Sequence, residues 1–277
     1  MEYVPAGDAE IPALGVGTFQ LDSDQARETV RTALDLGYRH VDTAEYYDNE
    51  EGVGAGIAAA PVDRDDVFLT TKVWRSNLRR DDVRAAAEAS LDRLGVDYVD
   101  LLLIHWPHPR VPVAETLRAM EELRAEGLTR HIGVSNFTRS QLADAMEVAD
   151  APIVTDQVLY HPFKAQRDLR QFCVESDVAL TAYSPLATGD VVGNDDLARI
   201  GRRYDRTAAQ VALRWLVQQD GVVAIPRSSS ADHLADNLDV FDFELTDAEM
   251  REVHGLTGSL RRRLENTLPK LMRSFPL

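Results

Sequence analysis

Four residues suited to proton transfer stand at or just after the ends of short apolar runs. Asp42, Lys72 and His105 each end a run typical of a buried strand, and Tyr47 follows Asp42 by five residues. Three of the 30 basic residues are lysines, so a lysine at a strand end indicates a chemical role that arginine does not fill. Lysine differs from arginine because its pKa moves readily and because it acts as a compact point charge. A carboxylate, a phenol, an ammonium and an imidazole in this pattern predict a proton-transfer site.

These side chains need a scaffold that gathers the ends of several strands. Short β-branched runs alternate with amphipathic segments along the chain, and this alternation predicts a parallel sheet. Eight strands within about 230 residues favour a closed (β/α)8 barrel (TIM barrel), in which chemistry gathers at the C-terminal strand ends. The expected strands are Leu14–Thr18, Tyr38–Asp42, Val67–Lys72, Val99–His105, Thr129–Ser135, Ile153–Val158, Ala179–Tyr183 and Val222–Pro226.

The segments between these strands carry helical spacing and helix-capping residues. The first expected helix is capped by Ser23. The others are Val83–Leu94, Val113–Ala125, Gln141–Val148, Arg167–Glu175, Asp195–Arg203, Thr207–Gln218 and Ser230–Leu238. We expect a short hairpin over the first residues, a C-terminal tail from Gly258, and a single domain over residues 1–277. A dinucleotide-binding Rossmann sheet is disfavoured, because Gly15-Val16-Gly17 lacks the third glycine of that motif.

The amino-acid composition limits the kinds of molecule that the protein is expected to bind and the compartment in which it is expected. A net charge of −16, spread along the chain, argues against nucleic acid or anionic membrane as a partner, since both need basic patches. No apolar run approaches the ~20 residues that span a bilayer. The first residues show no signal segment, so we expect a cytoplasmic protein. The single cysteine, Cys173, excludes an internal disulfide and a multi-cysteine metal site, and we expect it to be buried on a helix.

The acidic excess has a second interpretation. Aspartate (29) outnumbers glutamate (17) and lysine is nearly absent, a combination typical of proteins from halophiles that accumulate salt. The alternative is an acidic protein from an ordinary mesophile. We favour the halophile, which predicts that self-repulsion destabilises the fold at low salt and that molar salt relieves it.

Polar residues fall in phase just at the ends of seven of the expected strands, and the segments around them resemble the aldo-keto reductase family. The resemblance runs from about residue 10 to residue 250 and is closest to the prokaryotic branch of 2,5-diketo-gluconate and methylglyoxal reductases. The segments that carry it are Gly37–Ala44 with Tyr47 and Asn49-Glu50, Thr70–Trp74, Ile104–Pro107, Ile132–Phe137, Tyr183–Leu186 and Ile225–Ser228.

The resemblance implies a metal-free, NAD(P)H-dependent carbonyl reductase. Tyr47 is then the general acid, and a nearby Lys72 ammonium is expected to lower its pKa. Asp42 would hold Lys72 charged and in place, and His105 would donate to the carbonyl oxygen. Taken singly, each of these residues also has a structural explanation, such as a strand-end cap or a packed aromatic. Their joint occurrence in the family order favours the functional interpretation.

The resemblance also assigns the cofactor contacts. Ser135, Asn136 and Gln157 match the nicotinamide carboxamide site, Tyr183 the stacking aromatic, Ser184 and Leu186 the pyrophosphate site, Arg227 and Ser228 the 2′-phosphate site, and Asp236 and Asn237 the adenine site. Ser135 and Ser228 could instead simply cap helices. Arg227 replaces the family's lysine, and His233 replaces its arginine over the adenine. Because neutral histidine gives up a permanent charge, we expect NADPH to be preferred weakly and NADH to be usable.

Phe19, Trp74 and Trp106 are expected to line the substrate pocket, with Tyr46 as a weaker candidate. The short loop after His105 suggests an open mouth and small, polar carbonyl substrates. A monomer is the family expectation. Two alternatives remain open: a Schiff-base aldolase that uses Lys72, and a non-catalytic nucleotide sensor on the same scaffold. The tail does not match the family pattern, and the sequence leaves its role open.

Overall fold

The structure is a computed structural model that describes residues 1–258. All but the first residue of the expected C-terminal tail therefore lies outside the described residues. Eight parallel strands form one sheet in chain order, as the sequence predicts. They are β3 (Val16–Gly17), β4 (His40–Asp42), β5 (Phe68–Val73), β6 (Val99–Ile104), β7 (Thr129–Ser135), β8 (Ile153–Leu159), β9 (Ala179–Tyr183) and β10 (Val222–Ile225).

The sheet closes on itself where its first and last strands meet. The amides of Gly15 and Gly17 donate to the carbonyls of Ala224 and Pro226 (2.9 and 3.0 Å), and the Ala224 amide donates to Ala13 (2.9 Å). Leu14 also bridges Ala224 in parallel. We call this junction the seam. The first strand is shorter than expected, because regular pairing with β4 begins at Val16.

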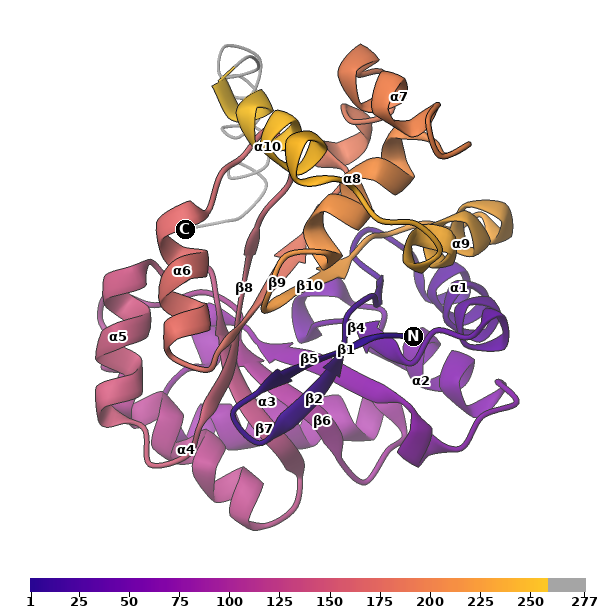
Figure 1. The fold of residues 1–277 in the computed structure, drawn as a ribbon. Coiled ribbons are helices and arrows are strands. Elements are labelled where there is room, and N and C mark those ends of the chain that lie inside the picture. Colours follow the sequence, from indigo (N-terminus) through magenta and orange to yellow (C-terminus); the bar gives the residue numbers. More distant parts are fainter. Residues whose placement is uncertain (259–277) are drawn as a thin grey trace.

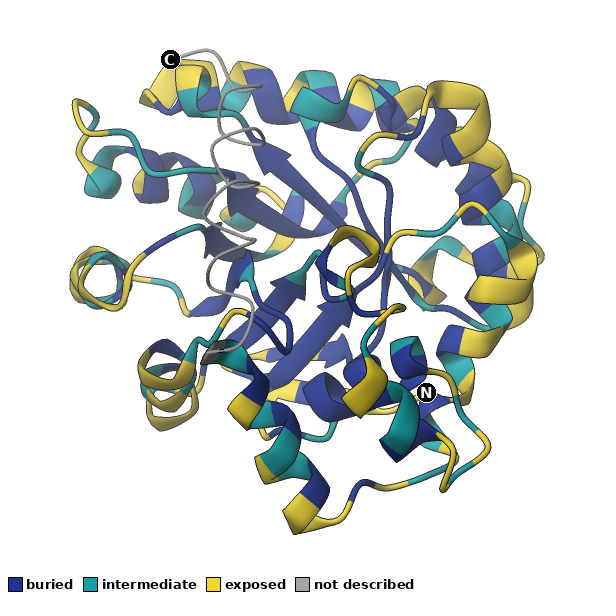
Figure 2. Ribbon diagram, turned by 90° about the horizontal axis from the view of Figure 1, so that it is seen from above, coloured by how far each residue is buried: buried dark blue, intermediate teal, exposed yellow. Residues whose placement is uncertain are grey.

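Each barrel strand is followed by at least one helix, so the predicted (β/α)8 architecture is confirmed (Figure 1). Buried residues gather in the strands and on the inner faces of the helices, whereas exposed residues line the outer helix faces (Figure 2). No helix in the described part is long and apolar enough to cross a membrane. The helices are α1 (Ser23–Leu36), α2 (Glu50–Ala58), α3 (Arg80–Leu94), α4 (Val113–Ala125), α5 (Arg139–Val148), α6 (Arg167–Glu175), α7 (Asp195–Gly201), α8 (Ala208–Val217), α9 (Ala231–Leu238) and α10 (Asp247–Gly255).

Helix α2 was not expected, because its sequence carries three glycines and glycine disfavours helices. Packing explains them. A Cβ at Gly52 would lie 2.0 Å from the Ser23 carbonyl oxygen, and one at Gly54 would lie 2.0 Å from that of Leu94. The glycines let α2 approach the start of α1 and the end of α3 closely. This tertiary contact outweighs the poor helix propensity and places the loop before α2 over the barrel mouth.

The N-terminal hairpin, β1 (Tyr3–Ala6) paired with β2 (Ala9–Pro12), lies at the opposite end of the barrel. Its apolar side chains form a second core with inward-facing residues of the barrel strands, among them Leu101, Leu103 and Val154. The hairpin therefore plugs the N-terminal end of the barrel. This leaves the C-terminal strand ends as the place for a site.

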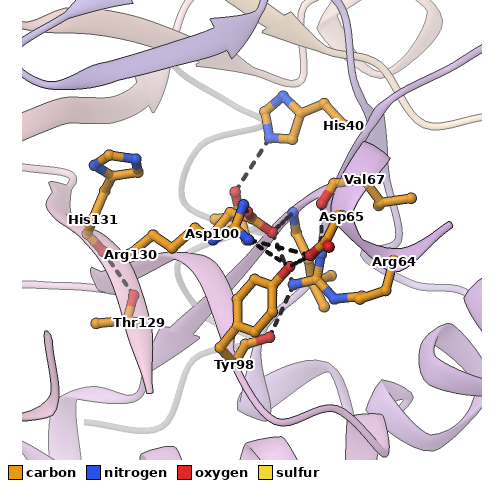
Figure 3. A network of polar contacts seen from close by, with 11 residues as sticks. His40, Arg64, Asp65, Val67, Tyr98, Asp100, Thr129, Arg130 and His131 are labelled. Carbon is orange, nitrogen blue, oxygen red and sulfur yellow. Dashed lines mark hydrogen bonds and ion pairs between the residues drawn. The ribbon is translucent and has the colours of Figure 1, made fainter. Parts of the chain in front are cut away.

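A charged network ties three strands together at the plugged end (Figure 3). Asp100 on β6 is 3% exposed and accepts hydrogen bonds from Arg64, Arg130 and the Leu69 amide. Both guanidiniums also lie over the Tyr98 ring, at 4.4 and 4.2 Å from its centroid. Three donors thus compensate one buried carboxylate.

Candidate active site

Lys72 lies at the centre of a compact polar cluster inside the barrel mouth. Its side chain is buried, and its ammonium has three donors to satisfy. It donates to three acceptors: Asp42 Oδ1 (2.6 Å), the carbonyl oxygen of Thr43 (2.7 Å) and Tyr47 Oη (3.3 Å). The second Asp42 oxygen accepts from Gln157 Nε2 at 2.7 Å. The strand-end residues predicted from the sequence therefore meet.

Burial decides the protonation states here. Desolvation, followed by the Asp42 charge, raises the pKa of Tyr47 well above its usual value. Desolvation, followed by the Lys72 charge, lowers the pKa of His105 well below its usual value. Desolvation also lowers the pKa of Lys72, while Asp42 opposes that shift. The expected depression of the Tyr47 pKa was therefore wrong: desolvation is the dominant effect on this phenol, and the Asp42 charge acts in the same direction. At neutral pH the site holds a phenol and a neutral imidazole.

His105 follows β6 and faces the same cluster. Its ring lies 5.6 Å from that of Tyr47, centroid to centroid, in an edge arrangement. Its Nδ1 atom is buried and has no hydrogen-bond partner among the described residues. A buried polar nitrogen without a partner is uncommon and calls for an explanation. A ligand polar atom would provide one.

Aromatic rings surround the cluster. Phe19 packs against Tyr47 at 5.0 Å between ring centroids. Trp74 stacks on Tyr46 at 4.0 Å and meets His105 edge-on at 5.0 Å. Trp106 directly follows His105 and is half-buried. Phe19 and Trp74 thus lie next to Tyr47 and His105, and Tyr46, the weaker candidate, stacks on Trp74. Their role in lining a substrate pocket stays a prediction.

The residues expected to hold a carboxamide form a hydrogen-bonded group next to Asp42. Tyr183 donates to Asn136 Oδ1 (2.9 Å), and Asn136 Nδ2 donates to Ser135 Oγ and to the His105 carbonyl oxygen. Ser135 in turn donates to the Gln157 carbonyl oxygen. Asn136 has a positive φ of 63°, which turns its side chain away from the regular strand path. Amides, a hydroxyl and a half-buried aromatic ring suit a planar carboxamide-bearing ring.

The other expected cofactor residues extend away from this group. Ser184, Ala187, Thr188 and Gly189 all have positive φ in the loop after β9, where the Ala187 and Gly189 amides close tight turns onto the Ser184 and Leu186 carbonyls. Leu186 lies in that loop.

The residues expected at the 2′-phosphate and adenine lie at and before α9. Arg227, His233 and Asp236 are exposed, and Ser228 is half-buried beside Ser230, which caps α9. Asn237 is buried and bonds Tyr38, so it also stabilises helix packing. The donor set and its arrangement fit a nicotinamide dinucleotide.

Two residues at the barrel mouth were not identified as site residues from the sequence. The buried Asn49 donates to the carbonyls of Thr18 and Leu21 and accepts from Thr43, which fixes the loop that carries Phe19. Glu45 bonds the loop after β5. Asn49 belongs to one of the segments that resemble the family, so the sequence did point to this residue. Glu45 carried no signal, because its partners are backbone and amide groups of a different loop.

The fold and this cluster together define a class of protein, and comparison with known proteins agrees. Residues 13–257 match the model of the aldo/keto reductase family. The chain belongs to that family, whose members use nicotinamide cofactors, and it is an oxidoreductase enzyme of carbonyl-reducing type.

The relatives are similar over nearly their whole length. A glyoxal reductase of Bacillus subtilis (strain 168) is 41% identical over 253 residues, which is 91% of each chain. A 9,11-endoperoxide prostaglandin H2 reductase of Trypanosoma cruzi (strain CL Brener) is 40% identical over 255 residues, 91% of this chain and 89% of that one. A crystal structure assigned to a 2,5-diketo-D-gluconic acid reductase B is 46% identical, with a TM-score of 0.91 over 92% of this chain and 91% of that one.

Proposed function

We propose that this protein reduces small, polar aldehydes and ketones to alcohols, with NADPH preferred and NADH usable. When bound, the reduced nicotinamide supplies a hydride to the carbonyl carbon. The developing alkoxide needs a proton, and in this proposal Tyr47 donates it. Glyoxal reductase and 2,5-diketo-D-gluconic acid reductase among the similar proteins support a small or polar carbonyl substrate.

The observation that carries the proposal is the arrangement of acceptors around Lys72. Tyr47 Oη accepts a hydrogen bond from Lys72 Nζ (3.3 Å), so its own proton is free to be donated elsewhere. As that proton leaves, the neighbouring ammonium offsets the new phenolate charge. Asp42, bonded to Lys72 and Gln157, keeps the ammonium in place. A neutral His105 has one ring N–H to donate to the carbonyl oxygen.

The same geometry disfavours the aldolase alternative. A Schiff-base lysine must be neutral and must have a free Nζ lone pair. Here all three Lys72 donors face acceptors, and one acceptor is a carboxylate at 2.6 Å. These contacts favour the ammonium form. Turnover of a carbonyl substrate distinguishes the proposed reductase from the nucleotide-sensor alternative, which would bind the cofactor without reaction.

Substitution of Tyr47 tests the proposal. The loss of absorbance at 340 nm should be measured in 2 M KCl with NADPH and then NADH, against methylglyoxal, glyceraldehyde and a keto-sugar acid. A general acid contributes roughly 10²- to 10⁴-fold, so Tyr47→Phe should lose at least about 100-fold in kcat. Tyr98→Phe, at the plugged end of the barrel, is the matched control and should retain turnover.

Either of two results would count against the proposal. Wild-type rates in Tyr47→Phe would remove Tyr47 as the proton donor. Tight cofactor binding without turnover of any carbonyl would favour the sensor.

A further inference from the structure

Two loops meet at one carboxylate beside the barrel mouth. Glu45 opens the single turn Glu45–Tyr47 that follows β4, and Trp74 begins the loop that follows β5. Glu45 Oε1 accepts the Trp74 backbone N–H at 2.7 Å and Asn77 Nδ2 at 2.9 Å. One oxygen atom therefore joins the two loops.

The joined loops carry the aromatic wall of the site. Tyr46, next to Glu45, stacks on Trp74 with an interplanar angle of 21°. The Trp74 ring meets His105 edge-on, at an interplanar angle of 81°. The position of this wall relative to His105 depends on the position of the Trp74 backbone, and the Trp74 N–H is bonded to Glu45.

We propose that Glu45 is a positioning residue that holds the Tyr46–Trp74 wall against His105 and thereby sets the size of carbonyl substrate that the site accepts. The inference rests on the proposed function and names a specificity device for the same site. Glu45 itself acts through Trp74 and does not need to touch the substrate.

The chemistry of the contact suits a carboxylate. An ionised carboxylate only accepts hydrogen bonds, and bonds to a charged acceptor are stronger than bonds between neutral groups. Glu45 is half-buried, and burial raises its pKa while the bonds from Trp74 and Asn77 oppose that shift. Truncation to alanine would leave two donors without this acceptor and would free both loops.

Substrates of two sizes test the inference. With methylglyoxal, Glu45→Ala should raise KM about 10-fold, the equivalent of roughly one lost hydrogen bond, and leave kcat within about twofold. With benzaldehyde the loss should be smaller, so the ratio of specificity constants shifts toward the larger substrate. Glu45→Gln keeps an accepting oxygen and should return to within about threefold of wild type. Glu51→Ala, an exposed glutamate on α2, is the matched control.

A readout independent of turnover is the emission of Trp74. Glu45→Ala should shift the tryptophan emission, because the stacking on Tyr46 loosens. The shift should disappear when the same change is made in a Trp74→Phe background, and Glu51→Ala should not produce it. This comparison separates an effect at Trp74 from a general loss of structure.

Several outcomes would overturn the inference. One is a Glu45→Ala variant with wild-type KM and emission. Another is an equal loss of kcat for both substrates, which would indicate general disruption. If the wild type reduces no carbonyl with either cofactor, the proposed function fails and substrate selection by Glu45 fails with it. The emission comparison would then still show whether Glu45 fixes Trp74.

Discussion

At the scale of single residues, the surroundings of Lys72 explain why this chain, so poor in lysine, places one here. Three acceptors converge on Nζ from different directions. An ammonium has three donors in a tetrahedral arrangement, whereas a guanidinium presents a planar fork on a larger head. Arginine would not fit the buried position between Asp42 and Tyr47. At Lys72 the geometry therefore requires a compact cation and not the arginine that is usual in this chain.

Cofactor choice also belongs to this scale. His233 and Arg227 are exposed near the start of α9, where the resemblance assigns the adenine and the 2′-phosphate. We expect the wild-type ratio of specificity constants, NADPH over NADH, to stay below about 10³, since one lost phosphate contact is worth ~1.5–3 kcal/mol. His233→Arg should raise that ratio by about 10-fold. A wild-type ratio above about 10³, or no response to His233→Arg, would contradict the expectation.

Residue identities in the site were predictable, but their electrostatics were not. Asp42, Lys72 and His105 were found because each ends an apolar run and because barrel strands end at one mouth. Tyr47 was found through its spacing of five residues from Asp42, which matches the family resemblance. The Tyr47 pKa was predicted in the wrong direction, because the sequence shows a neighbouring cation and does not show the extent of desolvation. Glu45 was missed for a related reason: its partners are 29 and 32 residues away in the chain.

At the scale of elements, strands were predicted better than helices. The eight strand runs all became barrel strands, because buried parallel strands have a distinctive composition. Helix α2 was missed because its glycines serve close packing. Helix α10 was missed although Thr246 and Glu249 form a capping box at its start, a signal that was readable in the sequence.

The network around Asp100 should stabilise the barrel without touching the chemistry. Asp100→Asn removes the buried carboxylate that Arg64 and Arg130 share, so we expect a loss of about 2 kcal/mol in the free energy of unfolding. Denaturant titration measures this loss. Glu28→Gln, which breaks an exposed pair with Arg31, should cost less than about 1 kcal/mol. Equal effects of the two changes would refute the role given to the network.

Buried histidines should make the barrel sensitive to acid. Burial lowers the pKa of His40 and of His161 to about 4. Between pH 6.5 and 4 the unfolded chain binds protons that the folded chain does not bind, so stability is full above pH 6.5 and falls as the pH decreases. Each histidine contributes at most ~1.4 kcal/mol per pH unit. Asp156, whose pKa burial raises, acts in the opposite direction.

Comparison of wild type with His40→Asn isolates one of these terms. His40 lies between the Pro12 carbonyl and the Thr70 hydroxyl, and asparagine at this position does not titrate. The variant should be less stable at neutral pH. Its unfolding free energy should also change less steeply with pH across the window, by about one proton. Identical slopes for the two proteins would show that His40 is not neutral in the fold.

At the scale of the whole molecule, the net charge of −16 determines how stability is expected to depend on salt. We expect the melting temperature in 2 M KCl to exceed that in 0.1 M KCl by at least about 5 °C. If charge screening is the cause, most of the gain should appear by about 1 M, where the Debye length is already ~3 Å. Equal melting temperatures at the two salt concentrations would refute the halophilic interpretation.

The seam between β3 and β10 has a consequence for association between molecules. Three backbone hydrogen bonds near Ala224 close the ring of strands. If they opened, the sheet would expose two unpaired edges, and such edges are templates for pairing with another chain. Strong mutual repulsion at physiological salt would hinder that pairing. In molar salt this protection disappears, so the few bonds at Gly15, Gly17 and Ala224 become the barrier that keeps neighbouring molecules from adding strands to one another.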